Sequence, residues 1–118
     1  MHKTVILEIN GKNVNIDEKI APLIDYINKN YTYTQCSCEG DVKDSGELAY
    51  IAFNIGHFTI FIDKLRKQGC DKFLSRVMSR RLDVVPTICS CECKNVIYTI
   101  IFRFKQSEIQ KILDEIMI

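Results

Sequence analysis

The order of hydrophobic and polar positions along the chain predicts hairpins separated by helices. Residues 5–9 are aliphatic apart from one acid, and they lead into Asn10-Gly11. Asn-Gly is the dipeptide most typical of a two-residue hairpin turn, because both of its residues accept positive φ. We therefore expect a return strand at residues 13–16.

Four later stretches carry apolar side chains at the three- and four-residue spacing of one helix face. They are Ile20, Leu23, Ile24 and Ile27; Phe58, Phe61, Ile62 and Leu65; Phe73, Leu74, Val77 and Met78; and Ile109, Ile112, Leu113 and Ile116. Pro22 fits only the first turn of its helix, and Gly69 makes the third stretch either a separate helix or a kinked continuation of the second. Ser107 and Gln110 have the spacing of a capping box before the last helix.

The segments between these helices predict further strands. We expect strands at residues 31–39, 48–53, 86–93 and 96–104, with a polar loop at 40–47 and a two-residue turn at Lys94-Asn95. Hairpins separated by helices indicate an α+β two-layer sandwich, with a mainly antiparallel sheet built from hairpins and the helices on one face. A chain of 118 residues fits one such domain, residues 1–118.

A cysteine-containing motif occurs twice. The pattern Thr-x-Cys-Ser-Cys-Glu begins at Thr34 and again at Thr87. Together with the strands and helices around each copy, it suggests an internal pseudo-repeat of residues 17–68 and 70–117.

The two motifs raise the question of a metal site. Cys36, Cys38, Cys89 and Cys91 could supply four thiolates to zinc, but their spacing differs from that of a standard zinc knuckle. If Lys94-Asn95 is the turn, Cys91 faces Tyr98 and Cys89 faces Ile100, on the more apolar side of the hairpin. We therefore expect core packing of the thiols beneath the helices, with no metal and no cofactor.

Composition and charge limit the classes of protein. Hydrophobic residues make up 47% of the chain and charged residues 26%, with a net charge of +1, which is typical of a globular protein and not of a disordered one. No apolar run is long enough to cross a membrane, and the first residues lack a signal-peptide pattern. The expectation is a cytoplasmic protein with reduced cysteines and no membrane partner.

Two segments are candidates for ligand binding. Basic residues concentrate between Lys64 and Arg81, and Arg76, Arg80 and Arg81 are suited to bidentate contacts with phosphate, although a solvated helix face would have the same composition. The loop Cys38-Glu39-Gly40-Asp41 could present carboxylates and backbone amides to a ligand, or could be an ordinary polar turn. A catalytic arrangement of Cys38, His57 and Asp41 is a further alternative, and His2 is set aside because it is next to the terminus.

Part of the sequence resembles known families. The resemblance to small uncharacterised proteins of bacteriophages and Gram-positive bacteria covers about the first half of the chain, at Ile20-Ala21-Pro22-Leu23-Ile24, Asn28, Thr34, Cys38-Glu39-Gly40-Asp41 and Tyr50-Ile51-Ala52-Phe53. This resemblance implies an accessory protein of host takeover or counter-defence that acts by binding. Residues 37–41 also resemble the Ser-Cys-Ser-Gly-Arg segment of the wybutosine-synthesising tRNA methyltransferases, with Glu39 and Asp41 replacing the second serine and the arginine. The replacement of the arginine removes the basic group that such a site would use.

These patterns together favour a non-enzymatic binding protein, expected to be a homo-oligomer, that sequesters a phosphate-bearing small molecule or nucleotide. The expected site consists of Cys38, Glu39, Gly40, Asp41, Arg76, Arg80 and Arg81. One alternative is a protein-protein inhibitor that covers a host factor with a sheet edge or the basic helix. Another is a methyltransferase-like or cysteine-dependent enzyme.

Overall fold

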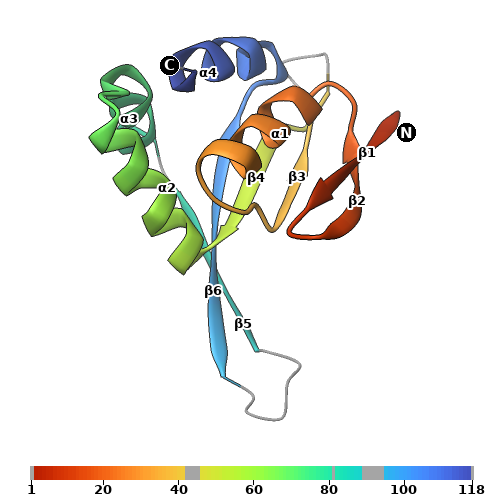
Figure 1. Cartoon of the computed structure of the whole chain (residues 1–118), viewed down its shortest axis with the longest axis horizontal. Helices are drawn as coiled ribbons and strands as arrows, with labels where there is room; N and C mark the ends of the chain where they lie inside the picture. The colour runs from red at the N-terminus through yellow and green to blue at the C-terminus, as the bar shows by residue number, and fades with distance from the viewer. Residues whose placement is uncertain (1, 42–45, 81, 89–94, 118) are drawn as a thin grey trace.

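The computed structural model describes residues 2–41, 46–80, 82–88 and 95–117, and within them it confirms an α+β fold (Figure 1). The strands are β1 (Thr4–Ile9), β2 (Lys12–Asp17), β3 (Cys36–Cys38), β4 (Ala49–Asn54), β5 (Asp83–Ile88) and β6 (Val96–Phe104). The helices are α1 (Ala21–Asn30), α2 (Ile55–Lys67), α3 (Asp71–Met78) and α4 (Ile109–Ile116), the last preceded by a 3-10 turn, η1 (Gln106–Glu108). None of these helices has the length and apolar content needed to cross a bilayer.

The first hairpin forms as the sequence predicts. Asn10 and Gly11 have φ values of 52° and 76°, and they join β1 to β2 with Ile9 paired to Lys12. Positive φ at both residues is the geometry that matches the twist of a two-stranded hairpin. The hairpin is a sheet of its own, separate from the four-stranded antiparallel sheet of order β3-β4-β6-β5.

One face of the four-stranded sheet packs against the helices. Its core side chains include Ile51, Phe53 and Phe102, and every helix contributes buried residues to the same cluster, such as Leu23, Phe61, Phe73 and Ile112. Phe61 stacks on Phe53 with ring centroids 5.0 Å apart and meets the ring of Phe73 at 5.9 Å. The regular apolar spacing of the helices thus builds a single aromatic-rich core.

The expected position of the first two thiols is wrong. Cys36 pairs with Ala52 and Cys38 with Tyr50, whereas Ser37 between them pairs with Ile51, whose side chain lies in the core. Successive strand residues point to opposite faces, so both cysteines lie on the face away from the helices. Cys36 is exposed and Cys38 half-buried, while Cys70 is buried. Cys89 and Cys91 lie outside the described residues.

Two strand predictions also need correction. The strand expected at 31–39 is limited to Cys36–Cys38. In the last hairpin Ile100 and Tyr98, expected opposite Cys89 and Cys91, pair instead with Val84 and Pro86, and the final pair is Ile88 with Val96. Because the last pair is Ile88 with Val96, the connection between the two strands is residues 89–95, and the expected two-residue turn at Lys94-Asn95 is wrong.

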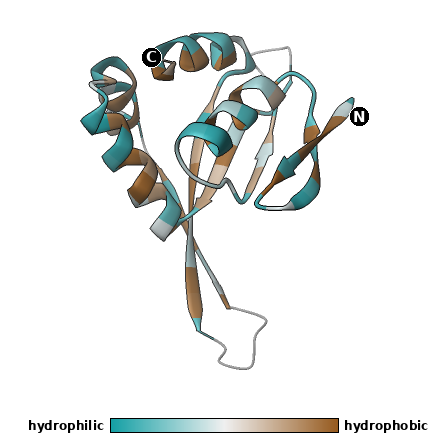
Figure 2. Cartoon of the chain, in the orientation of Figure 1, coloured by the Kyte–Doolittle hydropathy of each residue, from teal (hydrophilic) through white to brown (hydrophobic). Residues whose placement is uncertain are grey.

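The β5–β6 hairpin extends beyond the helices as an arm, which we define as residues 84–88 and 96–98 (Figure 1). Its exposed apolar side chains are Val84, Val85, Ile88, Val96 and Tyr98. Pairing places Ile88 opposite Val96 and Pro86 opposite Tyr98, on the face that continues the core-facing side of β6. Figure 2 shows hydrophobic residues continuing from the body of the sheet into this part of β6.

Candidate functional site

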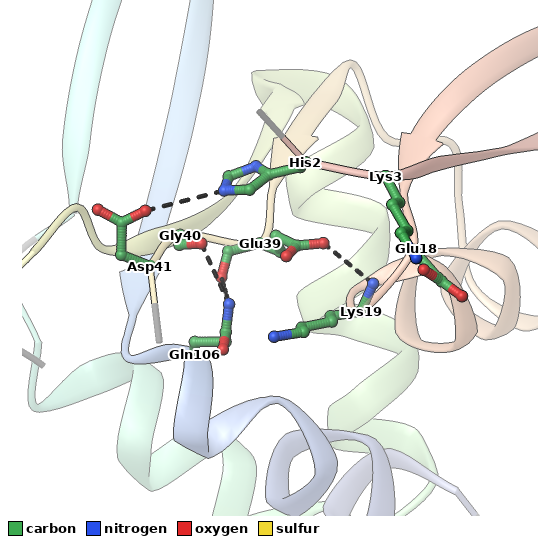
Figure 3. A pocket seen from close by; sticks show the side chains of 8 residues that line it. All are labelled: His2, Lys3, Glu18, Lys19, Glu39, Gly40, Asp41 and Gln106. Carbon is green, nitrogen blue, oxygen red and sulfur yellow. Dashed lines mark hydrogen bonds and ion pairs between the residues drawn. The ribbon is translucent and has the colours of Figure 1, made fainter. Parts of the chain in front are cut away.

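A polar pocket of about 250 Å³ lies where the first hairpin, the loop after β3 and η1 meet (Figure 3). Its lining residues come from four separate parts of the chain: His2, Lys3, Glu18, Lys19, Glu39, Gly40, Asp41 and Gln106. The structure therefore brings together three residues of the expected site, Glu39, Gly40 and Asp41. The fourth loop residue, Cys38, lies directly beside them at the end of β3.

Gly40 gives the loop its shape. Its φ is +70°, and a Cβ at this position would lie 2.5 Å from the Ala49 nitrogen and 2.6 Å from the Glu47 oxygen. Only glycine can adopt this left-handed backbone conformation and also leave room for the backbone of residues 47–49, which passes close to it. The Gln106 side-chain amide donates to the carbonyl oxygens of Glu39 and Gly40, at 3.3 and 3.1 Å, and so attaches the loop to η1 (Figure 3).

Glu39 is a buried acid in this pocket. The residue is only 5% exposed, and its Oε1 accepts a hydrogen bond from the Lys19 backbone N–H at 3.1 Å. Among the described residues, no cationic side chain forms an ion pair with it. A buried carboxylate is costly unless it is paired, so Glu39 is available to a cationic group that enters the pocket.

Cationic side chains line the same pocket. Within the described part of the chain, the ammonium groups of Lys3 and Lys19 form no hydrogen bond or ion pair. The Lys19 side chain extends across the pocket toward Gln106 (Figure 3). Glu18, Glu39 and Asp41 add three carboxylates to these two lysines, so the pocket carries both signs of charge with a small excess of negative charge.

His2, Asp17 and Cys38 form a cluster next to the pocket. Nδ1 of His2 donates to Oδ2 of Asp17 at 3.1 Å, and Nε2 lies 3.8 Å from Oδ1 of Asp41. The Glu39 N–H donates to the same Asp17 oxygen at 3.0 Å. His2 is therefore part of the folded structure, although the sequence offered no reason to include it.

The environment of the Cys38 thiol does not activate it as a nucleophile. Burial raises its pKa, and the carboxylates of Asp17 and Glu47 raise it further. The Gly40 N–H, 3.4 Å from the sulfur, acts in the other direction but does not outweigh them. Catalytic cysteines depend on a lowered pKa and a positive environment, which this thiol lacks.

The histidine of the candidate catalytic arrangement lies elsewhere. Nδ1 of His57 is 2.8 Å from Oγ1 of Thr32, and its ring contacts Tyr33 with centroids 5.8 Å apart. It lines a different pocket from the one that contains Asp41. The structure thus does not assemble Cys38, His57 and Asp41 into one site.

Two arginines of the expected site, Arg76 and Arg80, form ion pairs with other parts of the protein. Arg76 forms ion pairs with Glu108 and Glu115, and Arg80 with Glu108, so that α3 is connected to η1 and α4. Neither arginine lines the pocket, and Arg81 lies outside the described residues. Arg80 lies two residues beyond the end of α3, and both it and Arg76 donate to Oε2 of Glu108.

Five residues of the pocket were not predicted from the sequence: His2, Lys3, Glu18, Lys19 and Gln106. No motif joins them, because they are brought together by the packing of the first hairpin and η1 against the loop after β3. Gln106 was close to an expected feature, since the predicted capping residue was Ser107. In the structure Glu108 takes the capping role, accepting from the Lys105 N–H at 3.0 Å.

The fold and the pocket define an α+β protein with a small polar site of mixed charge. No protein-family model, no curated protein and no solved structure matches the chain. The resemblances to phage proteins and to tRNA methyltransferases therefore stay expectations from the sequence.

Proposed function

We propose that the chain is a non-enzymatic binding protein whose pocket holds a small molecule with both an anionic and a cationic group. The proposal rests on one observation: the same pocket contains the buried Glu39 carboxylate and the Lys19 ammonium group, and neither has an ionic partner among the described residues. A ligand amine would meet Glu39, and a ligand phosphate or carboxylate would meet Lys19 and Lys3.

This proposal narrows the class of ligand expected from the sequence. The volume of about 250 Å³ is below the usual range of pockets for drug-sized molecules. The excess of carboxylates over lysines disfavours a polyanion such as a nucleoside triphosphate. A small zwitterion, for example an amino acid or an aminoalkyl phosphate, matches both the size and the charge.

The surroundings of Cys38 support a binding role over cysteine catalysis. The pKa of Cys38 is raised, and His57, the histidine of the candidate catalytic arrangement, belongs to another surface.

Isothermal titration against amino acids, aminoalkyl phosphates, inorganic phosphate and mono- and cyclic nucleotides tests the proposal. We expect binding of a zwitterion, weakened by roughly tenfold or more in both Lys19→Met and Glu39→Gln, since each removes a charge-assisted contact. Lys29→Met is the matched control, because Lys29 lies on α1 and pairs with Asp25 instead of lining this pocket. Absence of heat with every ligand in a folded sample would contradict the proposal.

A second function, self-association, is favoured by the arm. Val84, Ile88, Val96 and Tyr98 are each between 45% and 68% exposed, and no residue of the arm is charged. An uncharged apolar surface suits a contact between two identical copies, because symmetry then brings no like charges together. We propose that a second copy of the chain covers the arm.

A further inference from the structure

Three potential metal ligands meet beside the pocket, each from a different strand region. His2 precedes β1, Asp17 ends β2 and Cys38 ends β3. One ligand atom from each, an imidazole nitrogen, a carboxylate oxygen and a thiol sulfur, lies within 4.8 Å of the others, and all three residues are half-buried. Asp17 and Cys38 belong to different sheets and His2 precedes β1, so only the folded chain assembles them.

The spacing is close to that of a zinc site. Zinc binds nitrogen and oxygen at about 2.0–2.2 Å and sulfur at about 2.3 Å, so tetrahedral ligand atoms lie roughly 3.3–3.8 Å from one another. His2 Nδ1 and Asp17 Oδ2 are already 3.1 Å apart. The Cys38 sulfur lies within 4.8 Å of the other two ligand atoms.

The surroundings also suit a cation. The Glu39 N–H donates to Oδ2 of Asp17, which fixes the orientation of the carboxylate, and the same oxygen has a further lone pair for the ion. The Asp41 carboxylate lies beside the other ring nitrogen, with Oδ1 3.8 Å from His2 Nε2, where it can accept from the Nε2–H and orient the imidazole for binding through Nδ1.

We propose that His2, Asp17 and Cys38 form a zinc-binding site that joins the β1–β2 hairpin to the four-stranded sheet. Mixed nitrogen, oxygen and sulfur ligands favour zinc over magnesium or calcium, which prefer oxygen alone. On binding, the thiol releases its proton to solvent, and the thiolate and carboxylate together balance the charge of the ion. The site differs from the four-cysteine set expected from the sequence, of which it uses only Cys38.

Cobalt(II) titration of the reduced, chelator-treated full-length protein tests the site without any organic ligand. We expect visible bands of tetrahedral cobalt and a sulfur-to-cobalt charge-transfer band, both removed by added zinc. Cys38→Ser should abolish the charge-transfer band, and His2→Gln should weaken cobalt binding by roughly tenfold or more. His2→Gln lies outside the secondary structure, so it provides a test even where the Cys38 variant is poorly folded.

Cys36→Ser is the matched control, since Cys36 lies two residues away on the same face of β3 and is not part of the cluster. It should leave both the spectrum and the affinity unchanged. A charge-transfer band that persists in Cys38→Ser, equal loss in Cys36→Ser, or no cobalt spectrum at all would overturn the proposal. Because no organic ligand is present, none of these outcomes depends on the proposed function of the pocket.

Discussion

Gly40 is the residue on which the shape of the pocket depends most. With φ at +70° and neighbouring backbone atoms 2.5–2.7 Å from the position of a Cβ, no other residue fits without moving the chain. Gly40→Ala should therefore lower the free energy of unfolding by at least about 2 kcal/mol, as measured by urea denaturation.

Gly11 provides the control for this substitution. It has a similar φ of +76°, but nothing lies within 4 Å of the Cβ position. Gly11→Ala should cost only about 1 kcal/mol, because it adds backbone strain without a clash. Equal losses for the two variants would show that the contact around Gly40 has no part in stability.

At the scale of elements, ion pairs connect α3 to η1 and α4. Burial acts to raise the pKa of Glu108, but hydrogen bonds from Arg80 and from the Lys105 N–H, with the charges of Arg80 and Arg76, outweigh it and hold the pKa below its usual value. A lowered pKa in the folded state means that these contacts stabilise the fold at neutral pH. Their contribution is lost as the pH falls below about 4, toward the lowered value.

Glu108→Gln should therefore destabilise the protein at pH 7 by roughly 1–3 kcal/mol, because Arg76 and Arg80 lose a charged acceptor. The difference in free energy of unfolding between wild type and Glu108→Gln should decrease when denaturation curves are measured at progressively lower pH. Glu8→Gln, on an exposed position of β1, should change little at any pH. A Glu108 effect that does not depend on pH would contradict this role of the ion pairs.

The elements also show which features the sequence could predict. The four helices follow from apolar spacing, and the first hairpin from Asn10-Gly11, because these signals are local. The orientation of β3 did not follow, since it is only three residues long and its pairing with β4 places Ser37, not the cysteines, toward the core. The register of β5 and β6 depends on the length of their connection, which alternation of residue types does not determine.

The pocket was predictable only in part for a related reason. Glu39, Gly40 and Asp41 form a recognisable loop, whereas Lys19 and Gln106 join them from distant positions. The cluster of arginines was typical of an anion-binding site. The sequence did not show that Arg76 and Arg80 form ion pairs with Glu108 and Glu115.

At the scale of the whole molecule, the arm predicts an oligomer. Ile88→Asp would place a charge in the proposed interface, so light scattering after size exclusion should show wild type as an oligomer and the variant as a monomer. Ile6→Asp is the control, because Ile6 has the same exposed fraction, 68%, on a different strand. If wild type is a monomer at every concentration measured, the proposal of self-association through the arm is contradicted.

The central claim, that the mixed-charge pocket is the binding site, is tested most directly by amide chemical shifts in a titration with the best zwitterionic ligand. We predict that the shifts concentrate at Lys3, Lys19, residues 39–41 and Gln106, and that Glu39→Gln raises the ligand concentration needed to produce them by roughly tenfold or more. Shifts confined to Arg76 and Arg80 or to the arm, with the pocket residues unchanged, would contradict this claim.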